Sequence, residues 1–462
     1  MPLIIPVENQ VRELDPKLLL ACIAANRGFS SIIGFRREMH FHISSFPRGI
    51  YLSKSVTAAS DMMFQIMRKL GHEIVAWDEE ALVHLPPDIY YSRRLSPSAM
   101  ASVSHFFAWG EDNAELWRQY PELPNPPKIH VTGNPRNDLL RAGMRSFYED
   151  EVKKICNTHG DFILINTNFN HVNAFSPVQN LFQPVSQPGE KPQFGRAARG
   201  MTREYAEGFQ AHKQSIFKSV LKIIPTLDSA FPDHTIIVRP HPTESQDVYH
   251  EIAARCTRVR VTNEGNVVPW LMAAKALIHN GCTTGVEAYA MGVPAISYRA
   301  AVNDYYDFGF YRLPNMVSHQ CFNFDELRQL LQKILTGELG PANTEKSQSL
   351  INHYLAAQEG PMASERIVDV LEKIIDGRAE LPKPNFRNRL EGSSIAAGRT
   401  LIKRFKSYLP GSHNRPAFQR HRYPEIPLEY VRSRIARFQR VIGVSRELKI
   451  SQMTKKFFQI HS

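Results

Sequence analysis

The chain has 462 residues, of which 43% are hydrophobic and 22% are charged, and its net charge is +11. These fractions are ordinary for a folded globular protein and argue against a disordered chain. No run of about 18 apolar residues occurs and the N-terminus lacks a basic region, so we expect neither a membrane span nor a signal peptide. The five cysteines follow no metal-binding or disulfide spacing, which favours a reducing, cytoplasmic compartment.

Residues 1–147 alternate short apolar runs with amphipathic segments. We expect strands at residues 3–7, 30–35, 50–53, 73–77, 90–91, 105–109 and 128–131, and helices at 15–26, 58–70 and 137–144. Strands that alternate with helices are typical of a doubly wound parallel sheet. The segment 1–147 is therefore predicted to be an N-terminal Rossmann-like domain.

Three carboxylates directly follow the expected strand 73–77, at the edge where such sheets bind ligands. They are Asp78, Glu79 and Glu80. Because neighbouring side chains of a strand point in opposite directions, we expect one or two of them to face a ligand. They are catalytic candidates, as nucleophile or base, and the alternative is an acidic turn that only starts a helix. Glu8, Arg36 and Lys54 lie near the same edge and are less specific candidates for contact with a ligand.

Residues 148–380 repeat the alternation and are predicted to form a second Rossmann-like domain. A helix at 147–158 leads to a strand at 162–165, which ends in the polar run Asn166-Thr167-Asn168. Residues 174–200 have no period and predict a mobile loop. Further helices are expected at 205–224, 326–335 and 348–376, and by analogy with two-domain folds the last of these could return to the first domain.

The most informative stretch is residues 235–299. A strand at 235–238 ends at Arg239, and Pro240-His241-Pro242 follows; the two prolines exclude both helix and ladder and hold His241 on a rigid loop. A strand at 276–279 is followed by a hydroxyl-rich turn, and the next helix is expected at about 286–291. Since both loops follow parallel strands, they are expected at the same edge of the sheet.

The turn offers backbone N–H groups, two hydroxyls and a helix N-terminus, which together suit a phosphate. Glu287 is expected on the first helical turn, where a carboxylate would repel phosphate and better accept hydrogen bonds from ribose. Each feature alone also has an ordinary explanation. His241 could be a loop histidine without a function, the two threonines could only cap the helix, and Glu287 could only complement the helix dipole. Their ordered combination predicts a nucleotide site formed by Asn166, Thr167, Asn168, Arg239, His241, Pro242, Asn280, Gly281, Thr283, Thr284, Gly285 and Glu287, with His241 also a catalytic candidate.

The segments RPHP at 239–242 and HNGCTTGVEAYAMGVPAIS at 279–297 resemble the C-terminal half of GT-B nucleotide-sugar glycosyltransferases. Over most of its length the chain resembles the bacterial surface carbohydrate (capsule and O-antigen) biosynthesis family, and it is similar to Kdo transferases and CDP-glycerol glycerophosphotransferases. The resemblance implies an α/β GT-B fold, two Rossmann-like domains facing a cleft, with residues 1–147 on the acceptor side and residues 148–380 on the donor side. It also implies a nucleotide-sugar donor such as CMP-Kdo, a glycan or lipid-linked acceptor, no cofactor and no metal.

Residues 381–462 hold 18 Lys and Arg against 4 Glu, so the basicity of the chain lies in this tail. A helix at 427–442 would carry Val431, Ile435, Phe438 and Ile442 on one face and Arg432, Arg434, Arg437 and Arg440 on the other. This pattern predicts a basic amphipathic helical tail. Two alternatives stay open for this tail. It could dock on an anionic inner-membrane surface, or it could pack on the body of the protein and leave its arginine face in solvent. Nucleic acid is not an expected partner, because aromatic platforms are missing.

The leading prediction is a cytoplasmic glycosyltransferase of bacterial surface polysaccharide, such as capsule or lipopolysaccharide, peripheral to the membrane. Three alternatives stay open. A CDP-glycerol or polyol-phosphate transferase would attack phosphorus and would need a base but no nucleophilic carboxylate. A UDP-sugar 2-epimerase shares the fold and would need carboxylates on both domains. A non-catalytic scaffold would use the nucleotide site or the basic tail only for binding.

Overall fold

The computed structural model describes residues 1–123, 128–185, 189–307, 312–376, 381, 383–409, 412 and 414–462. The chain packs into two compact units. Unit 1 contains Met1–Leu82, Pro87–Phe147 and Ile351–Ser462, and unit 2 contains Val83–Pro86 and Tyr148–Leu350. Residues 351–376, which the sequence analysis grouped with the second domain, therefore belong to unit 1. Helix α17 (Ala363–Ile375) packs there on helix α1 (Gln10–Asn26), where Arg27 pairs with Asp369 and Glu372.

Unit 1 is built on an eight-stranded sheet in the order β13-β14-β2-β1-β3-β4-β5-β6. The first six strands are β1 (Pro2–Val7), β2 (Ser30–Phe35), β3 (Ile50–Ser53), β4 (Glu73–Ala76), β5 (His105–Ala108) and β6 (Ile129–Val131), and each pairs in parallel with its neighbours among them. The strands β1–β5 are mostly buried apolar runs, as is typical of a parallel sheet, whereas the edge strand β6 is only partly buried. The expected parallel α/β architecture is confirmed.

The helices of unit 1 lie between its strands and in its C-terminal segment. They are α1, α2 (Arg36–Phe41), α3 (Asp61–Lys69), α4 (Pro87–Arg94), α5 (Pro97–Ala101), α6 (Glu111–Arg118), α7 (Pro135–Asp138), α17, α18 (Phe386–Lys406), α19 (Pro416–Arg422) and α20 (Leu428–Val441), with 3-10 turns at Ile43–Ser45, Ala58–Ser60 and Ala142–Tyr148. The strand expected at 90–91 is wrong. These tyrosines lie in α4, where Pro87 favours a helix start and Tyr90 is buried.

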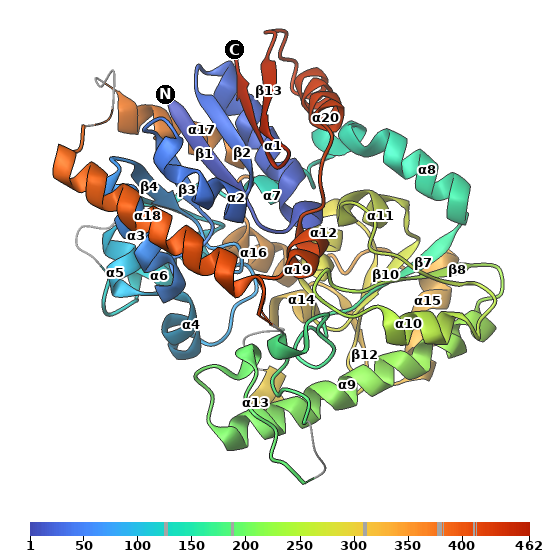
Figure 1. Ribbon diagram of the computed structural model, residues 1–462. Helices are drawn as coiled ribbons and strands as arrows, with labels where there is room; N and C mark the ends of the chain where they lie inside the picture. Colours follow the sequence, from blue (N-terminus) through green and yellow to red (C-terminus); the bar gives the residue numbers. More distant parts are fainter. Residues whose placement is uncertain are drawn as a thin grey trace. The chain divides into compact units, whose positions relative to one another are not determined.

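The C-terminal segment is more than a helical tail, because its last residues complete the sheet of unit 1. Strands β13 (Lys449–Thr454) and β14 (Phe457–His461) form a hairpin, and β14 pairs antiparallel with β2 (Figure 1). Phe457 lies opposite Gly34, where a Cβ atom would be 2.3 Å from the carbonyl oxygen of Lys456. Glycine at 34 is thus required by the close approach of the two strands.

Helix α20 packs its apolar face on the rest of unit 1, which decides between the two alternatives given for this helix. Val431, Ile435 and Phe438 are buried, and the helix lies against α1. Arg434, expected on the solvated face, is instead buried, and its Nη2 lies 2.6 Å from Asp15 Oδ2. The body-packed reading therefore holds for this helix, because a buried ion pair and three apolar side chains anchor it.

Unit 2 is built on a six-stranded parallel sheet in the order β12-β11-β10-β7-β8-β9. The strands are β7 (Phe162–Asn166), β8 (Thr235–Arg239), β9 (Val259–Val261), β10 (Ala276–His279), β11 (Ala295–Tyr298) and β12 (His319–Cys321). The helices are α8 (Glu149–His159), α9 (Arg203–Ala230), α10 (Asp247–Ala253), α11 (Val267–Ala273), α12 (Thr283–Met291), α13 (Asp304–Asp307), α14 (Arg312–Met316) and α15 (Phe324–Leu335), with 3-10 turns at Pro177–Gln179 and Arg196–Ala198; α16 (Glu345–Tyr354) crosses into unit 1.

Helix α9 is longer than expected and runs along one side of unit 2 (Figure 1). Its apolar residues, among them Ile216, Val220 and Ile224, are buried in the core cluster of this unit together with residues of β7, β8 and β10. The expected loop at 174–200 contains the two 3-10 turns, and part of it, 186–188, lies outside the described residues.

Candidate functional site

The order in which strands are added to the sheet of unit 2 reverses at one point. From β7 the chain continues to β8 and β9 on one side, and β10, β11 and β12 then follow on the other side. The last residues of three neighbouring strands are in register here: Asn166 pairs with Arg239 and with His279. Such a switch point, at the carboxyl ends of parallel strands, is where open α/β sheets bind ligands. The loops after β7, β8 and β10 all start at this edge, as expected.

His279 fixes the turn that follows β10. The backbone N–H of Gly281 donates to His279 Nδ1 over 3.0 Å, and His279 Nε2 lies 2.9 Å from Ser318 Oγ. Burial lowers the pKa of His279 to about 3, so the ring is neutral, accepts at Nδ1 and carries its proton on Nε2. A Cβ atom at Gly285 would come within 2.5 Å of Nε2, so glycine lets helix α12 pack on the ring. No sequence pattern indicates this role of His279.

Helix α12 starts at Thr283, three residues earlier than expected. Its N-cap is Cys282, whose Sγ accepts from the backbone N–H of Thr284 and lies 2.9 Å from Thr284 Oγ1. Thr283 and Thr284 therefore stand on the first turn of the helix, and the reading of this pair as the N-cap is wrong. Glu287, expected on the first turn, lies one turn further along and is buried. The positive end of the helix dipole thus lies at the switch point.

Two buried asparagine side chains at the switch point are incompletely hydrogen-bonded. Asn280 is 7% exposed and Asn166 is 4% exposed. Among the described residues neither polar atom of the Asn280 amide has a hydrogen-bond partner, and Asn166 Oδ1 has none. Buried polar groups are nearly always satisfied, and an orphaned one costs about 1–3 kcal/mol. These amides therefore indicate a place where a polar ligand completes the structure.

Glu244 joins the loops that follow β7 and β8. Its carboxylate is fully buried and accepts from Thr167 Oγ1 (2.9 Å), the backbone N–H of Phe169 (2.9 Å), the backbone N–H of His241 (3.1 Å) and the hydroxyl of Tyr249 (2.7 Å). Burial raises the pKa of Glu244, and the four donors oppose that effect. No sequence pattern indicates Glu244, because two of its partners, Thr167 and Phe169, lie 77 and 75 residues away along the chain.

Arg239 and His241 have different surroundings at this edge. The guanidinium of Arg239 donates to the carbonyls of Glu264 and Gly265 and stacks 5.4 Å from the ring centre of Trp270. Arg239 thus holds the loop after β9, and burial lowers its pKa to about 9. His241 is half-buried, and its Nδ1 lies 2.8 Å from Thr243 Oγ1. This contact orients the ring that the two prolines position.

A buried lysine on α9 is a second residue that the sequence analysis missed. Lys213 is 1% exposed, and burial lowers its pKa to about 7, although Asp307, Glu244 and Cys282 are near enough to oppose the shift. Its signal in the sequence was a cation at helical spacing from Phe209 and Ile216 on an apolar face. A phosphate bound nearby would hold this lysine in its charged form.

Asp307 has ionic partners within unit 2. Its carboxylate lies 2.7 Å from His212 Nε2 and 3.6 Å from Arg299. Asp304 is exposed at the start of α13. Neither aspartate belongs to the group of residues that follows β7, β8 and β10.

The three carboxylates after β4, in unit 1, differ sharply in their surroundings. Asp78 is buried and accepts from Arg94 and from the hydroxyl of Tyr90 (2.8 Å). Glu79 is buried and accepts from Trp77 Nε1 over 2.7 Å. Glu80 alone is exposed, 3.1 Å from Arg12. No helix starts at this run, since α4 begins only at Pro87, so the acidic-turn alternative does not apply.

A buried charge network lies at the same edge of unit 1. The carboxylate of Glu13 lies 2.7 Å from both Lys17 Nζ and Lys54 Nζ. Glu8 lies 3.1 Å from Lys54 and 3.0 Å from Arg36, and Arg422 of α19 also contacts Glu8 at 2.6 Å. Burial alone would raise the pKa of both glutamates, but the surrounding cations lower it well below the usual range. The softer candidates Glu8, Arg36 and Lys54 are thus brought together.

Cations outnumber carboxylates beside this network. Arg399 and Lys403, on the inner side of α18, are half-buried, and no carboxylate partner is found for them among the described residues. Burial, together with the charges of Arg399, Arg36 and Arg37, lowers the pKa of Lys403 to about 7. We expect Lys403 to be largely the neutral amine above pH 7 and protonated below it.

Lys403 should therefore react with an amine-acylating ester at pH 7.5 faster than Lys406, which is exposed on the same helix. The rate should fall about ten-fold for each pH unit below 7. Peptide mapping by mass spectrometry measures both lysines in one sample. An Arg399→Gln variant, which removes one repelling charge, should slow the labelling of Lys403. Equal labelling of the two lysines at every pH would contradict the crowding of charge.

Comparisons with known proteins give no family assignment by sequence: no family model matches the chain, and no curated protein matches it. Solved structures do match. A variant of the wall teichoic acid polymerase TagF soaked with CDPG is 12% identical, with a TM-score of 0.51 over 82% of this chain and 89% of that chain. A second TagF variant also gives a TM-score of 0.51, at 12% identity, over 82% and 90% of the two chains.

A UDP-GlcNAc 2-epimerase from Methanocaldococcus jannaschii, in complex with UDP-GlcNAc and UDP, is 14% identical over 81% of this chain and all of that chain, with a TM-score of 0.48. At such identities a likeness shows the fold alone. The likeness to the two TagF structures, together with the two doubly wound units, shows the GT-B fold that the sequence predicted. Within the described residues, no helix has the length and hydropathy of a membrane span, and no three His, Cys, Asp or Glu residues are grouped as metal ligands would be.

Proposed function

We propose that unit 2 binds the nucleotide of an activated donor and that the chain transfers the donor's group during the synthesis of a bacterial surface polysaccharide. The observation that carries this proposal is the buried amide of Asn280, which lacks partners among the described residues at the N-terminal end of α12. A nucleotide phosphate at this position would accept from the amide N–H₂ and face the positive end of the helix dipole.

The chemistry required is charge stabilisation on a leaving phosphate. In glycosyl transfer an acceptor hydroxyl attacks the anomeric carbon, the bond from that carbon to the phosphate oxygen breaks, and the phosphate keeps the electron pair. The hydroxyl proton passes to a base, for which His241 is our candidate. Hydrogen-bond donors that are already in place for the developing anion lower the barrier. Asn280, the first turn of α12 and Lys213 are the groups that would stabilise it.

The donor we favour is a CMP-linked sugar such as CMP-Kdo, on the strength of the RPHP and turn motifs, with a growing glycan or a lipid-linked glycan as acceptor. Glu80 is the exposed member of its run, so a Glu80→Gln variant tests whether a carboxylate of unit 1 takes part. We propose that the reaction uses no cofactor and no metal, and that the protein works at the cytoplasmic side of the membrane.

A CDP-linked polyol donor is the second candidate, and one observation favours it. Asp78 and Glu79 are buried and already hydrogen-bonded, which leaves fewer carboxylates to act as a nucleophile. Attack of a hydroxyl on the β-phosphorus of such a donor breaks a P–O bond and needs only a base. Both donors release CMP, so the proposed phosphate site serves either reaction.

Thermal unfolding in the presence of CMP, CDP, UDP and GDP tests the proposal. Preferential binding to the folded chain should raise the unfolding temperature most with a cytidine nucleotide, since about 100-fold saturation adds about 2.7 kcal/mol of stability. CMP release from CMP-Kdo or from CDP-glycerol then identifies the donor, and EDTA should not change the rate. If none of the four nucleotides stabilises the chain, the proposal is wrong.

A further inference from the structure

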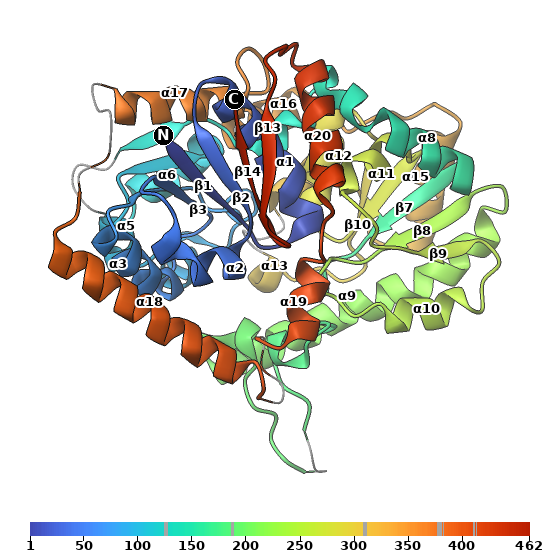
Figure 2. The same cartoon turned by 45° about the horizontal axis from the view of Figure 1, so that its top comes forward.

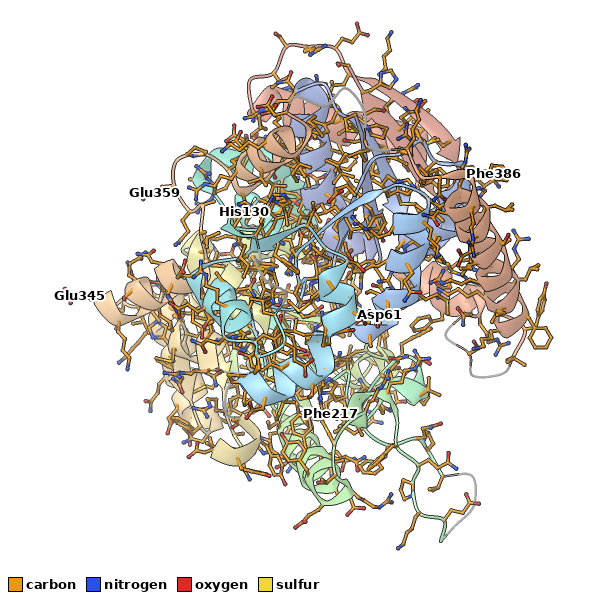
Figure 3. All side chains as sticks on the ribbon, turned by 90° about the vertical axis from the view of Figure 1, so that its left-hand side faces the viewer. Asp61, His130, Phe217, Glu345, Glu359 and Phe386 are labelled. Carbon is orange, nitrogen blue, oxygen red and sulfur yellow. The ribbon has the colours of Figure 1, made fainter. Side chains whose placement is uncertain are left out.

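Exposed apolar side chains gather on helix α18 and the turn that follows it. The exposed fractions are 81% for Phe386, 66% for Leu401, 69% for Phe405 and 84% for Tyr408. Leu390, Ile402 and Leu409 are also exposed. Single exposed apolar residues are common on protein surfaces, but a contiguous group marks an interaction site. Figure 3 shows the side chains of α18 standing out from unit 1, with Phe386 at its start.

The opposite face of α18 anchors the helix to unit 1. Gly392 and Ala396 are buried, and Ile395 packs on the core cluster beside α3. A Cβ atom at Gly392 would lie 3.0 Å from Cβ of Lys69, so the two helices approach closely (Figure 2). The apolar residues therefore cannot turn inward without the loss of this packing.

Helical periodicity places the exposed residues in one outward stripe. Leu401, Phe405 and Tyr408 are spaced by four and three residues, and Leu390 lies three turns before Leu401. The small residues Ser394 and Ala397 stand between Leu390 and Leu401 on this face.

The charge beside this stripe is of one sign. Arg387, Arg389, Arg404 and Lys406 are exposed on the same helix. The only acidic residue of α18 is Glu391, and its carboxylate lies 2.8 Å from Lys69 of α3. A surface that accepts α18 must therefore offer an apolar layer beneath a layer of negative charge.

We propose that α18 docks unit 1 on an anionic lipid bilayer, with the helix lying in the plane of the interface. Phe386, Leu401, Phe405 and Tyr408 enter the region between headgroups and acyl chains, while the cations beside them contact lipid phosphates. An interfacial helix needs this combination of apolar stripe, basic edges and low overall hydropathy. Helix α20, the membrane element expected from the sequence, cannot take this role because its apolar face is buried on α1. The inference does not depend on the proposed function.

Sedimentation of the full-length chain with vesicles tests the inference. It should bind vesicles that contain phosphatidylglycerol, bind pure phosphatidylcholine far less, and be released by salt. The double variant Leu401→Ser/Phe405→Ser should lower the affinity by about ten-fold or more. Arg404→Glu/Lys406→Glu should also weaken binding to the anionic vesicles. The replaced side chains are exposed or partly exposed, so thermal unfolding should confirm that both variants fold.

The matched control is Val302→Ser/Tyr305→Ser, which removes two exposed apolar side chains from unit 2, and it should bind like the wild type. Wild-type binding by the α18 variants would overturn the inference, as would equal binding to neutral and anionic vesicles. Analytical ultracentrifugation tests whether a second copy of the chain covers the stripe instead. If the wild type forms a dimer that the α18 variants abolish, and does not bind vesicles, the stripe is a dimer interface and the inference is wrong.

Discussion

Replacing Asn280 with alanine should lower the affinity for CMP by about ten-fold or more and leave the stability of the chain nearly unchanged. A hydrogen bond to a charged group contributes about 1.5–3 kcal/mol, which corresponds to ten-fold or more in affinity. The buried amide of Asn280 has no hydrogen-bond partner among the described residues, so its removal takes no interaction from the unliganded chain. Isothermal calorimetry and thermal unfolding measure the two quantities.

Asn323→Ala is the matched control in the same unit. The Asn323 side chain caps α15 by accepting from the backbone N–H of Glu326 over 2.9 Å. Its loss should cost about 1 kcal/mol of stability and leave CMP affinity unchanged. A variant of Asn280 that is strongly destabilised but binds CMP normally would show that its amide serves the fold and not a ligand.

Replacing Glu244 with alanine should have the largest effect on stability, about 3 kcal/mol or more, and should abolish CMP binding. The change leaves two hydroxyls and two backbone N–H groups without their buried acceptor, and each such loss is costly. The loops after β7 and β8 would then separate, and His241 would lose its fixed position. Chemical denaturation measures the stability.

Glu244→Gln should fall between alanine and the wild type, because it keeps one carbonyl acceptor but turns an N–H₂ group toward donors. Glu326→Ala is the control: this carboxylate also accepts from a backbone N–H, that of Phe322 at 2.8 Å, but at an exposed site. Its loss should cost less than about 1 kcal/mol. If Glu326→Ala lowered the stability as much as Glu244→Ala, the burial of the Glu244 carboxylate and its four donors could not be the cause.

Local patterns were sufficient to predict most of the parallel strands. The β2 and β3 strands lie where apolar runs at 30–35 and 50–53 placed them, because such runs are buried on both faces in a parallel sheet. A strand was expected at 90–91 because two adjacent tyrosines favour one. These residues instead lie in α4, which begins at Pro87 and buries Tyr90. Packing outweighs propensity over so short a segment.

The hairpin at the end of the chain was not predicted, because its partner β2 lies more than 400 residues earlier in the sequence. The same limit applies to the site. The sequence predicted the loops that carry His241 and Asn280, since each follows a recognisable strand. It missed Glu244, which joins the loops after β7 and β8, and Lys213, whose environment includes acidic groups far away in the sequence. A cysteine N-cap was missed because serine, threonine, aspartate and asparagine are the usual residues there.

A crystal structure of the chain with CMP tests the central claim most directly. We predict that the phosphate lies at the N-terminal end of α12, within hydrogen-bond distance of the Asn280 amide and the first helical turn. CMP bound elsewhere, with both polar atoms of Asn280 still lacking partners, would contradict the assignment of this switch point as the nucleotide site.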